Sequence, residues 1–311
     1  MTRLSRFALS LAAVASLAAL FAPVASSWPG ANGAIVFAAS GSSLDSGIRI
    51  APLGAERSQI TRLTSDPADS EPQVSPDGRQ VVFVRSSDPE AFGDDTPATI
   101  YLINVDGSGL RPVTDGLHPD EEPAFSASGS RIYFTRLDSG YGDVFSIRLD
   151  GGGLRQITTG SGTDHHPRAA SRGGLLTFER WGRYHHIFVS RADGSRIRDL
   201  TPKLKKPLAA ADPEFSPDGR RVVYSTSDRL ISVGVNGARP RLLLRPRAGF
   251  DRYYADPTFA PDGRSLLFST VDPETGRSSL RRLDSRRLRR LPNPLVEPHL
   301  SASNPAWLVR R

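Results

Sequence analysis

The sequence has 311 residues, including 25 Pro and 28 Gly, and it contains no Cys. The absence of Cys excludes disulfides, cysteine–metal sites and thiol catalysis. The formal net charge is +7, which would permit binding to nucleic acid, but the leader at the start of the chain predicts export, so no nucleic-acid partner is expected.

Residues 1–27 have the three parts of a secretory signal peptide. Arg3 and Arg6 form a positive start, Phe7–Ala22 is an apolar run of 16 residues, and small residues follow. The run is shorter than the ~20 residues of a membrane-spanning helix, which favours cleavage over a retained anchor. No later segment is apolar enough to cross a membrane. We therefore expect an exported protein of the periplasm, cell envelope or extracellular space, with one domain over residues 28–311.

The stretch Asp212–Thr226, DPEFSPDGRRVVYST, predicts a β-hairpin. Its first residues are extended, and Ser216-Pro217-Asp218-Gly219 fits a type I turn, because Pro presets φ at the second position and Gly tolerates the exit geometry. Residues 221–226 are rich in β-branched and aromatic side chains, as is typical of a strand.

Related hairpins recur along the chain, and each opens on a proline. These prolines are Pro72, Pro123, Pro167, Pro213, Pro257 and Pro305. The spacings between them are 51, 44, 46, 44 and 48 residues. A period in the forties with about four strands per unit is typical of a β-propeller blade.

Each unit continues with a third strand, a two-residue turn and a fourth strand. The predicted third strands are Ile100–Asn104, Val144–Leu149, His186–Arg191 and Leu230–Val235. The Asp-Gly or Asn-Gly pairs that follow favour type I′ turns. The predicted fourth strands end in Val113-Thr114, Ile157-Thr158 and Leu200-Thr201.

The two ends of the chain supply complementary parts of one blade. Gly33–Ser40 matches a second strand without a first, and Asn304–Val309 matches a first strand without a second. Second strands begin near Ile35, Val81, Ile132, Leu175, Val222 and Leu266. The predicted fold class is therefore all-β: a six-bladed β-propeller of four-stranded antiparallel blades, closed by the C-terminal strand in the first blade, which leaves no open blade edge.

The stretches SPDGRQVVF, DPEFSPDGRRVVYS and DPTFAPDGRSLLFS resemble the TolB-like propeller repeats, also called PD40 or WD40-like repeats. The resemblance covers Gly33–Val309, with close matches in blades two, five and six, and it implies the propeller fold. TolB of the bacterial Tol–Pal envelope system has a separate α/β domain before its propeller. Here only a few residues separate the signal from the first strand, so we do not carry over a Tol–Pal role.

Two groups of enzymes have similar propellers. Prolyl oligopeptidase-type peptidases also need an α/β-hydrolase domain with a G-x-S-x-G nucleophile elbow, and this sequence has no such motif. Oligogalacturonate lyases resemble these propellers too and use a metal with histidine residues. That resemblance makes a metal-assisted polysaccharide lyase or hydrolase the alternative function.

In a propeller the connections between blades and the loops between second and third strands share one face, here called the loop face. The SPDG and Asp-Gly turns lie on the opposite face, here called the turn face. The D-x-x-P residues are therefore expected at the loop-face mouth of the central channel, as a ligand-binding site made of Asp69, Glu71, Asp120, Glu122, Asp164, His166, Asp212, Asp256 and Asn304. Such an acidic mouth would attract a cation, a metal or a basic peptide. The alternative is structural, with these carboxylates accepting hydrogen bonds from the backbone of the next blade.

Charge and aromatic side chains further divide the predicted loop face. It is expected to be acidic on blades one to three and basic on blades four to six, through Arg180, Arg183, Lys203, Lys205, Lys206, Arg245, Arg247 and Arg252. A second basic cluster lies within residues 281–290, on the outer strands of blade six. It is interpreted as solvated edge charge or as a site for an acidic glycan or lipid. Candidates to stack on a sugar or peptide, or to pack within the loops, are Tyr141, Trp181, Tyr184, Tyr253 and Tyr254.

His118, His165 and His166 fall on neighbouring connections between blades and are the alternative metal ligands. No set of residues has catalytic spacing. The favoured hypothesis is therefore an exported, non-enzymatic binding or scaffold propeller without a cofactor. We expect it to engage a protein or an anionic cell-envelope polymer on its loop face.

Overall fold

The computed structural model of the chain describes residues 33–40, 46–88, 96–138, 140–160, 162–203, 209–226, 228–245, 253–272, 275–291 and 301–308. The predicted signal peptide lies outside the described residues, as do Lys205, Lys206, Arg247 and Arg252 of the predicted basic half. Within the described ranges, no helix has the length and apolar character needed to span a membrane.

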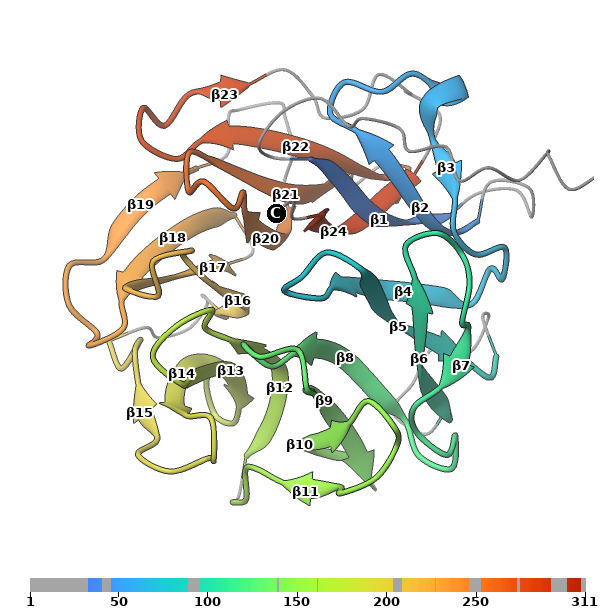
Figure 1. Cartoon of the computed structure of the whole chain (residues 1–311). Coiled ribbons are helices and arrows are strands. Elements are labelled where there is room, and N and C mark those ends of the chain that lie inside the picture. The colour runs from blue at the N-terminus through green and yellow to red at the C-terminus, as the bar shows by residue number, and fades with distance from the viewer. Residues whose placement is uncertain are drawn as a thin grey trace, which may run out of the picture.

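The strands form six four-stranded antiparallel sheets arranged as blades around one axis (Figure 1). Blade one consists of β24 (Ser301–Leu308), β1 (Ala34–Ser40), β2 (Gly47–Pro52) and β3 (Thr61–Arg62). Blade two consists of β4 (Asp69–Val74), β5 (Gln80–Ser86), β6 (Ala98–Asn104) and β7 (Arg111–Pro112). Blade three consists of β8 (Asp120–Phe125), β9 (Arg131–Asp138), β10 (Tyr141–Arg148) and β11 (Arg155–Gln156).

The remaining blades repeat this order from the channel outward. Blade four consists of β12 (Thr163–Ala169), β13 (Leu175–Trp181), β14 (His186–Arg191) and β15 (Arg198–Asp199). Blade five consists of β16 (Ala211–Phe215), β17 (Arg221–Thr226), β18 (Arg229–Gly234) and β19 (Arg241–Leu244). Blade six consists of β20 (Tyr253–Phe259), β21 (Ser265–Val271), β22 (Ser278–Asp284) and β23 (Arg290–Leu291). The predicted six-bladed propeller is confirmed.

The C-terminal strand closes the ring within the first blade. Strand β24 pairs antiparallel with β1, and Trp307 lies opposite Ile35 in the register. The Trp307 side chain is buried in the cluster that joins blade one to Ala260 and Leu267 of blade six. The predicted closure is therefore confirmed, and burial of a large aromatic side chain stabilises it.

The hydrophobic core lies between the blades. Each of the six clusters of buried apolar side chains joins two neighbouring blades. The second strand contributes a fully buried phenylalanine in five blades, namely Phe37, Phe83, Phe134, Phe178 and Phe268. Because both sheet faces are covered, these strands are continuous apolar runs rather than alternating ones.

The predicted type I′ geometry of the Asp-Gly and Asn-Gly turns is wrong, because it needs a positive φ at both residues and only the glycine of each pair has one. The predicted SPDG turn of blade five does form. The N–H of Gly219 donates to the carbonyl of Ser216 at 2.8 Å, and Gly219 has φ +67°, which glycine adopts without strain. The Ser216 hydroxyl donates to Asp218 at 2.6 Å. This arrangement fixes the hairpin of blade five, as the sequence predicted.

The fourth strands are shorter than predicted, because each has only two paired residues in blades two to four. The threonine after each strand has a different role. The N–H of Ile100 donates to the Thr114 hydroxyl at 3.0 Å, and Val144 donates to Thr158 in the same way. The threonine therefore satisfies a buried N–H of the third strand and does not extend the fourth.

Candidate functional site

One residue of each inner strand turns toward the channel in a left-handed backbone conformation. It immediately precedes the proline of the blade, and its φ lies between 47° and 58°. These six residues, called the channel ring below, are Glu71, Glu122, His166, Asp212, Asp256 and Asn304. The register shifts at this point in every inner strand. Such bulges redirect side chains, so each blade contributes one polar group to the axis.

The channel ring ties neighbouring blades together. The N–H of Glu122 donates to the Glu71 carboxylate at 2.7 Å, and the N–H of His166 donates to Glu122 at 2.6 Å. Farther around the ring, the N–H of Asp256 donates to Asp212 at 3.3 Å. The structural alternative for the ring carboxylates, in which they accept hydrogen bonds from the next blade, is thus confirmed.

A second-strand residue holds the side chain of the ring residue in three blades. In blade three the Thr135 hydroxyl donates to Glu122 at 2.7 Å, and in blade five Ser225 donates to Asp212 at 2.8 Å. The same strand position in blade four is Glu179. A carboxylate therefore takes the place of a hydroxyl in the blade whose ring residue is His166.

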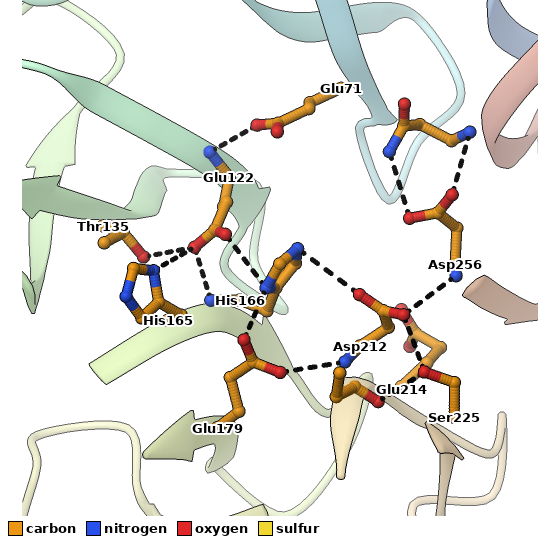
Figure 2. Close-up of polar contacts among 12 residues, drawn as sticks. Glu71, Glu122, Thr135, His165, His166, Glu179, Asp212, Glu214, Ser225 and Asp256 are labelled. Carbon is orange, nitrogen blue, oxygen red and sulfur yellow. Dashed lines mark hydrogen bonds and ion pairs between the residues drawn. The ribbon is translucent and has the colours of Figure 1, made fainter. Parts of the chain in front are cut away.

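His166 lies among three carboxylates, as Figure 2 shows. Its Nδ1 is 2.9 Å from Glu122 Oε1 and 3.1 Å from Glu179 Oε1, and its Nε2 is 3.5 Å from Asp212 Oδ1. Glu179 also accepts the N–H of Asp212 at 3.2 Å. Both ring nitrogens of His166 face carboxylates, so His166 does not accept the N–H of the next blade as the ring carboxylates do. Glu179 accepts that N–H in its place.

Burial and mutual repulsion set the protonation of the ring. Burial would lower the pKa of His166, but Glu122 and Glu179 raise it well above 6.5. Burial would raise the pKa of Glu122, but His166 and His165 hold it well below 4.5. Burial raises the pKa of Glu71 to about 8, helped by the charges of Glu122 and Glu121. At neutral pH the ring therefore combines an imidazolium, ionised carboxylates and a protonated Glu71.

The other three predicted site residues do not line the channel. Asp69, Asp120 and Asp164 are buried, and each forms a bidentate ion pair with an arginine of the second strand. In blade three the Arg136 guanidinium also stacks 5.5 Å from the Phe134 and Phe145 rings. The prediction that these aspartates line the channel mouth is wrong, because the pairing turns them into the blade.

The channel is narrow at the ring and wide on the turn face. The cavity at the ring has a volume of about 20 Å³, which is room for roughly one water. On the turn-face side a funnel of about 380 Å³ opens. Its walls include Phe125, Phe215, Phe259 and Trp307. The wide cavity on the axis is therefore on the face opposite to the predicted one.

Sequence reasoning missed four residues between the ring and the funnel. Gln73, Arg168, Glu214 and Thr258 line both cavities. Burial raises the pKa of Glu214 to about 7, although Arg168 opposes this increase. A signal existed, because each of these residues follows the blade proline and alternation along a strand returns its side chain to the channel.

The predicted division of charge does not apply to the channel. Its lining carboxylates come from blades two, three, five and six, and Arg180 of the predicted basic half is paired with Asp164. Among the predicted aromatic contacts, Tyr254 is buried against Phe268. Tyr141, with 69% of its surface exposed, does lie open to solvent.

Two of the three alternative metal ligands, His165 and His166, lie beside the same carboxylate, with their Nδ1 atoms 3.5 and 2.9 Å from Glu122 oxygens. His166 contacts the ring carboxylates, and His165 stacks on Trp181 with ring centroids 4.1 Å apart. The carbonyl of His118 accepts the N–H of Ala98 at 3.1 Å. Over the described ranges, no three His, Asp or Glu side chains form a group that fits a metal ion.

The closed ring of six blades and the turn-face funnel define a propeller with a central cavity. The sequence profile of the PD40 family, described as the TolB beta propeller domain, matches residues 72–250. The chain belongs to this family.

Comparison with known proteins supports the same fold. Dipeptidyl-peptidase 5 of Porphyromonas gingivalis is 34% identical over 71 residues, which are 23% of this chain and only 10% of that protein. TolB of Acinetobacter baumannii has a TM-score of 0.72 at 19% identity, over 91% of this chain and 68% of that one. A chain of the nidogen/laminin complex has a TM-score of 0.69 at 15% identity, over 89% and 99%. An oligogalacturonate lyase of Vibrio parahaemolyticus has a TM-score of 0.55 at 12% identity, over 79% and 70%. At these identities the solved structures show the fold alone.

Proposed function

We propose that the protein is an exported, non-enzymatic binding propeller that engages a protein or cell-envelope polymer in the turn-face funnel. The observation that carries this proposal is the shape of the channel. It is blocked at the ring and opens as a cavity of about 380 Å³ on one side. Concave cavities with aromatic walls and a few polar groups are the usual form of a binding site.

The wall and the floor of the funnel offer different chemistry. Phe125, Phe215 and Trp307 supply apolar surface, and aromatic side chains are frequent anchors of protein interfaces. Glu214 and Arg168 lie at the floor, 3.6 Å apart. A partner would therefore insert an apolar group with a polar tip. The chain of the nidogen/laminin complex that shares this fold belongs to a protein assembly, which is consistent with a protein as the partner.

Two features argue for a binding role over the alternative metal-assisted lyase. The carboxylates of the ring are engaged in hydrogen bonds between blades, and the His166 imidazole is engaged by Glu122 and Glu179. Export rests on the signal-like leader and is tested by sequencing the N-terminus of the mature protein. A start near residue 28 supports export, whereas an intact Met1 in the cytoplasm contradicts it.

Photo-crosslinking in the producing cells tests the location of the site. A photoreactive phenylalanine analogue is placed at Ala127, which lines the funnel, or at Tyr141, which is exposed on the loop face of the same blade. We expect adducts from position 127 and none from position 141. Adducts from position 141 alone would place the binding site on the loop face and contradict the proposal.

A further inference from the structure

A second cavity runs outward from the funnel between blades five and six on the turn face. It has a volume of about 470 Å³, and we call it the arginine groove. It shares five lining residues with the funnel: Arg172, Ser216, Pro217, Phe259 and Pro261. The two cavities are therefore adjacent, and an extended ligand seated in the funnel would reach the groove across these shared residues.

Arginines from three blades converge on this groove. Arg172 comes from the hairpin turn of blade four, Arg241 from the outer strand β19 of blade five, and Arg286 from the turn before β23 of blade six. Strands β19 and β23 are the outermost strands of neighbouring blades in Figure 1. All three side chains are exposed. In the part of the chain that the structure describes, no acidic side chain forms an ion pair with Arg172 or Arg286.

A fourth arginine fixes positive charge in the wall of the groove. The Arg221 guanidinium donates to the Ser232 carbonyl at 2.9 Å and to the Arg239 carbonyl at 2.8 Å. Burial lowers its pKa, and the neighbouring charge of Arg241 lowers it further. Repulsion between positive charges that are held together in this way decreases when an anion binds between them.

The remaining lining residues narrow the choice of anion. Asp218 and Asp262 also line the groove and would repel a uniformly charged polyanion. Phe259, Pro261 and Leu243 supply apolar surface between the charges. This combination fits a chain in which single carboxylates alternate with apolar side chains, which is an acidic polypeptide segment.

We infer that the arginine groove is a recognition site for a carboxylate of an extended polypeptide, whose adjoining part occupies the funnel. This inference rests on the proposed function and specifies the chemistry of the partner. The carboxylate comes either from an Asp or Glu side chain or from the C-terminus of the partner, and the two sources are separable by peptide chemistry.

Fluorescence anisotropy with a synthetic probe tests the inference on the whole protein. The probe is an end-blocked nonapeptide with glutamate and phenylalanine residues spaced by glycine and serine, labelled with an uncharged dye. A second peptide has glutamine in place of glutamate, and a third is the glutamine peptide with a free C-terminus. We expect the glutamate probe to bind about tenfold more tightly than the blocked glutamine peptide, with affinity that falls as salt increases. Tight binding of the third peptide would identify the C-terminus as the source.

Paired substitutions locate the contact. In Arg241→Gln/Arg286→Gln the affinity for the glutamate probe should fall about tenfold. The matched control is Arg155→Gln/Arg198→Gln, because these arginines begin the outer strands of blades three and four as Arg241 does in blade five. This control variant should bind the glutamate probe with the affinity of the wild type. Unchanged affinity in the groove variant, or equal affinity for the glutamate and blocked glutamine peptides, would overturn the inference.

A funnel variant separates failure of the inference from failure of the proposed function. Ala169 lines the funnel, and Ala169→Trp would fill part of it. If this variant abolishes probe binding and the groove variant does not, the peptide binds in the funnel and not in the groove. If neither variant alters binding, both proposals are wrong. If heparin binds through the groove arginines and the peptide does not bind, the ligand is a polyanion and the assignment to a polypeptide is overturned.

Discussion

Glu179 Oε1 lies 3.1 Å from Nδ1 of His166, at the strand position that holds a hydroxyl residue in blades three and five. Blade four therefore differs from blades three and five at two positions. An imidazolium takes the place of the ring carboxylate, and a carboxylate takes the place of the hydroxyl that holds it. The exchange keeps the series of backbone contacts from Glu71 to Asn304 continuous.

Substitution of His166 should destabilise the fold strongly. His166→Gln leaves Glu179 buried without its cation and leaves Glu122 with His165 alone, and we expect a loss of about 3 kcal/mol in the free energy of unfolding at pH 7. Because the pKa of His166 is raised in the fold, its contribution is complete below about pH 6.5. It is lost as the pH rises through the raised value. Urea denaturation at several pH values measures both effects, and an equal loss at all pH values would contradict the ion-pair account.

Glu71 should make the protein less stable as the pH rises. The folded state keeps a proton on Glu71 up to a pH of about 8, whereas the unfolded chain releases it near pH ~4.3. Stability therefore declines between these values. Glu71→Gln retains an oxygen to accept the N–H of Glu122, so its unfolding free energy should match the wild type near pH 4 and exceed it at pH 8. A variant that is less stable than the wild type at pH 8 would show that Glu71 is ionised in the fold.

The buried ion pairs of blades two to four should act on stability and not on binding. Asp120→Asn breaks the bidentate pair with Arg136, and we expect a loss of about 3 kcal/mol. Asp150→Asn is the control, because Asp150 and its partner Arg148 are both exposed and such pairs contribute little. Chemical denaturation measures the free energy of unfolding of both variants. If Asp120→Asn were as stable as the wild type but lost the photo-crosslinking to the partner, Asp120 would be a ligand-binding residue after all.

Closure of the ring should depend on Trp307. Trp307→Ala removes a side chain that is 5% exposed, and the cavity should lower the free energy of unfolding by about 4 kcal/mol. Tyr141→Ala, at a position that is 69% exposed, should alter it by no more than about 0.5 kcal/mol. If thermal or urea unfolding shows similar small effects for both, β24 does not hold the ring closed.

The fold was predictable because its signals are local and repeated. The turn at Ser216–Gly219 and the proline spacing each reappear in several blades, so the number of blades follows from counting. Closure followed because Gly33–Ser40 and Asn304–Val309 each lacked a partner strand.

The site was only partly predictable because the bulge before each proline breaks the alternation of the strand. In a regular strand, side chains two residues apart lie on the same face, so Asp69 and Glu71 were expected to point the same way. Instead Asp69 is buried beside Arg85 and Glu71 faces the channel. Glu179 lies outside the repeated motif altogether. Only a comparison of second strands, with Thr135 and Ser225 at the same position, would have identified it.

The funnel itself is tested most directly by blocking it. Cross-linking from position 127 is repeated in Ala169→Trp, which fills the funnel wall, and in Ala255→Trp, which places the same bulk beside Asp256 on the loop-face side of the ring. We expect Ala169→Trp to lose most of the adduct and Ala255→Trp to retain it. Full adduct formation in a folded Ala169→Trp protein would contradict the claim that the turn-face funnel is the binding site.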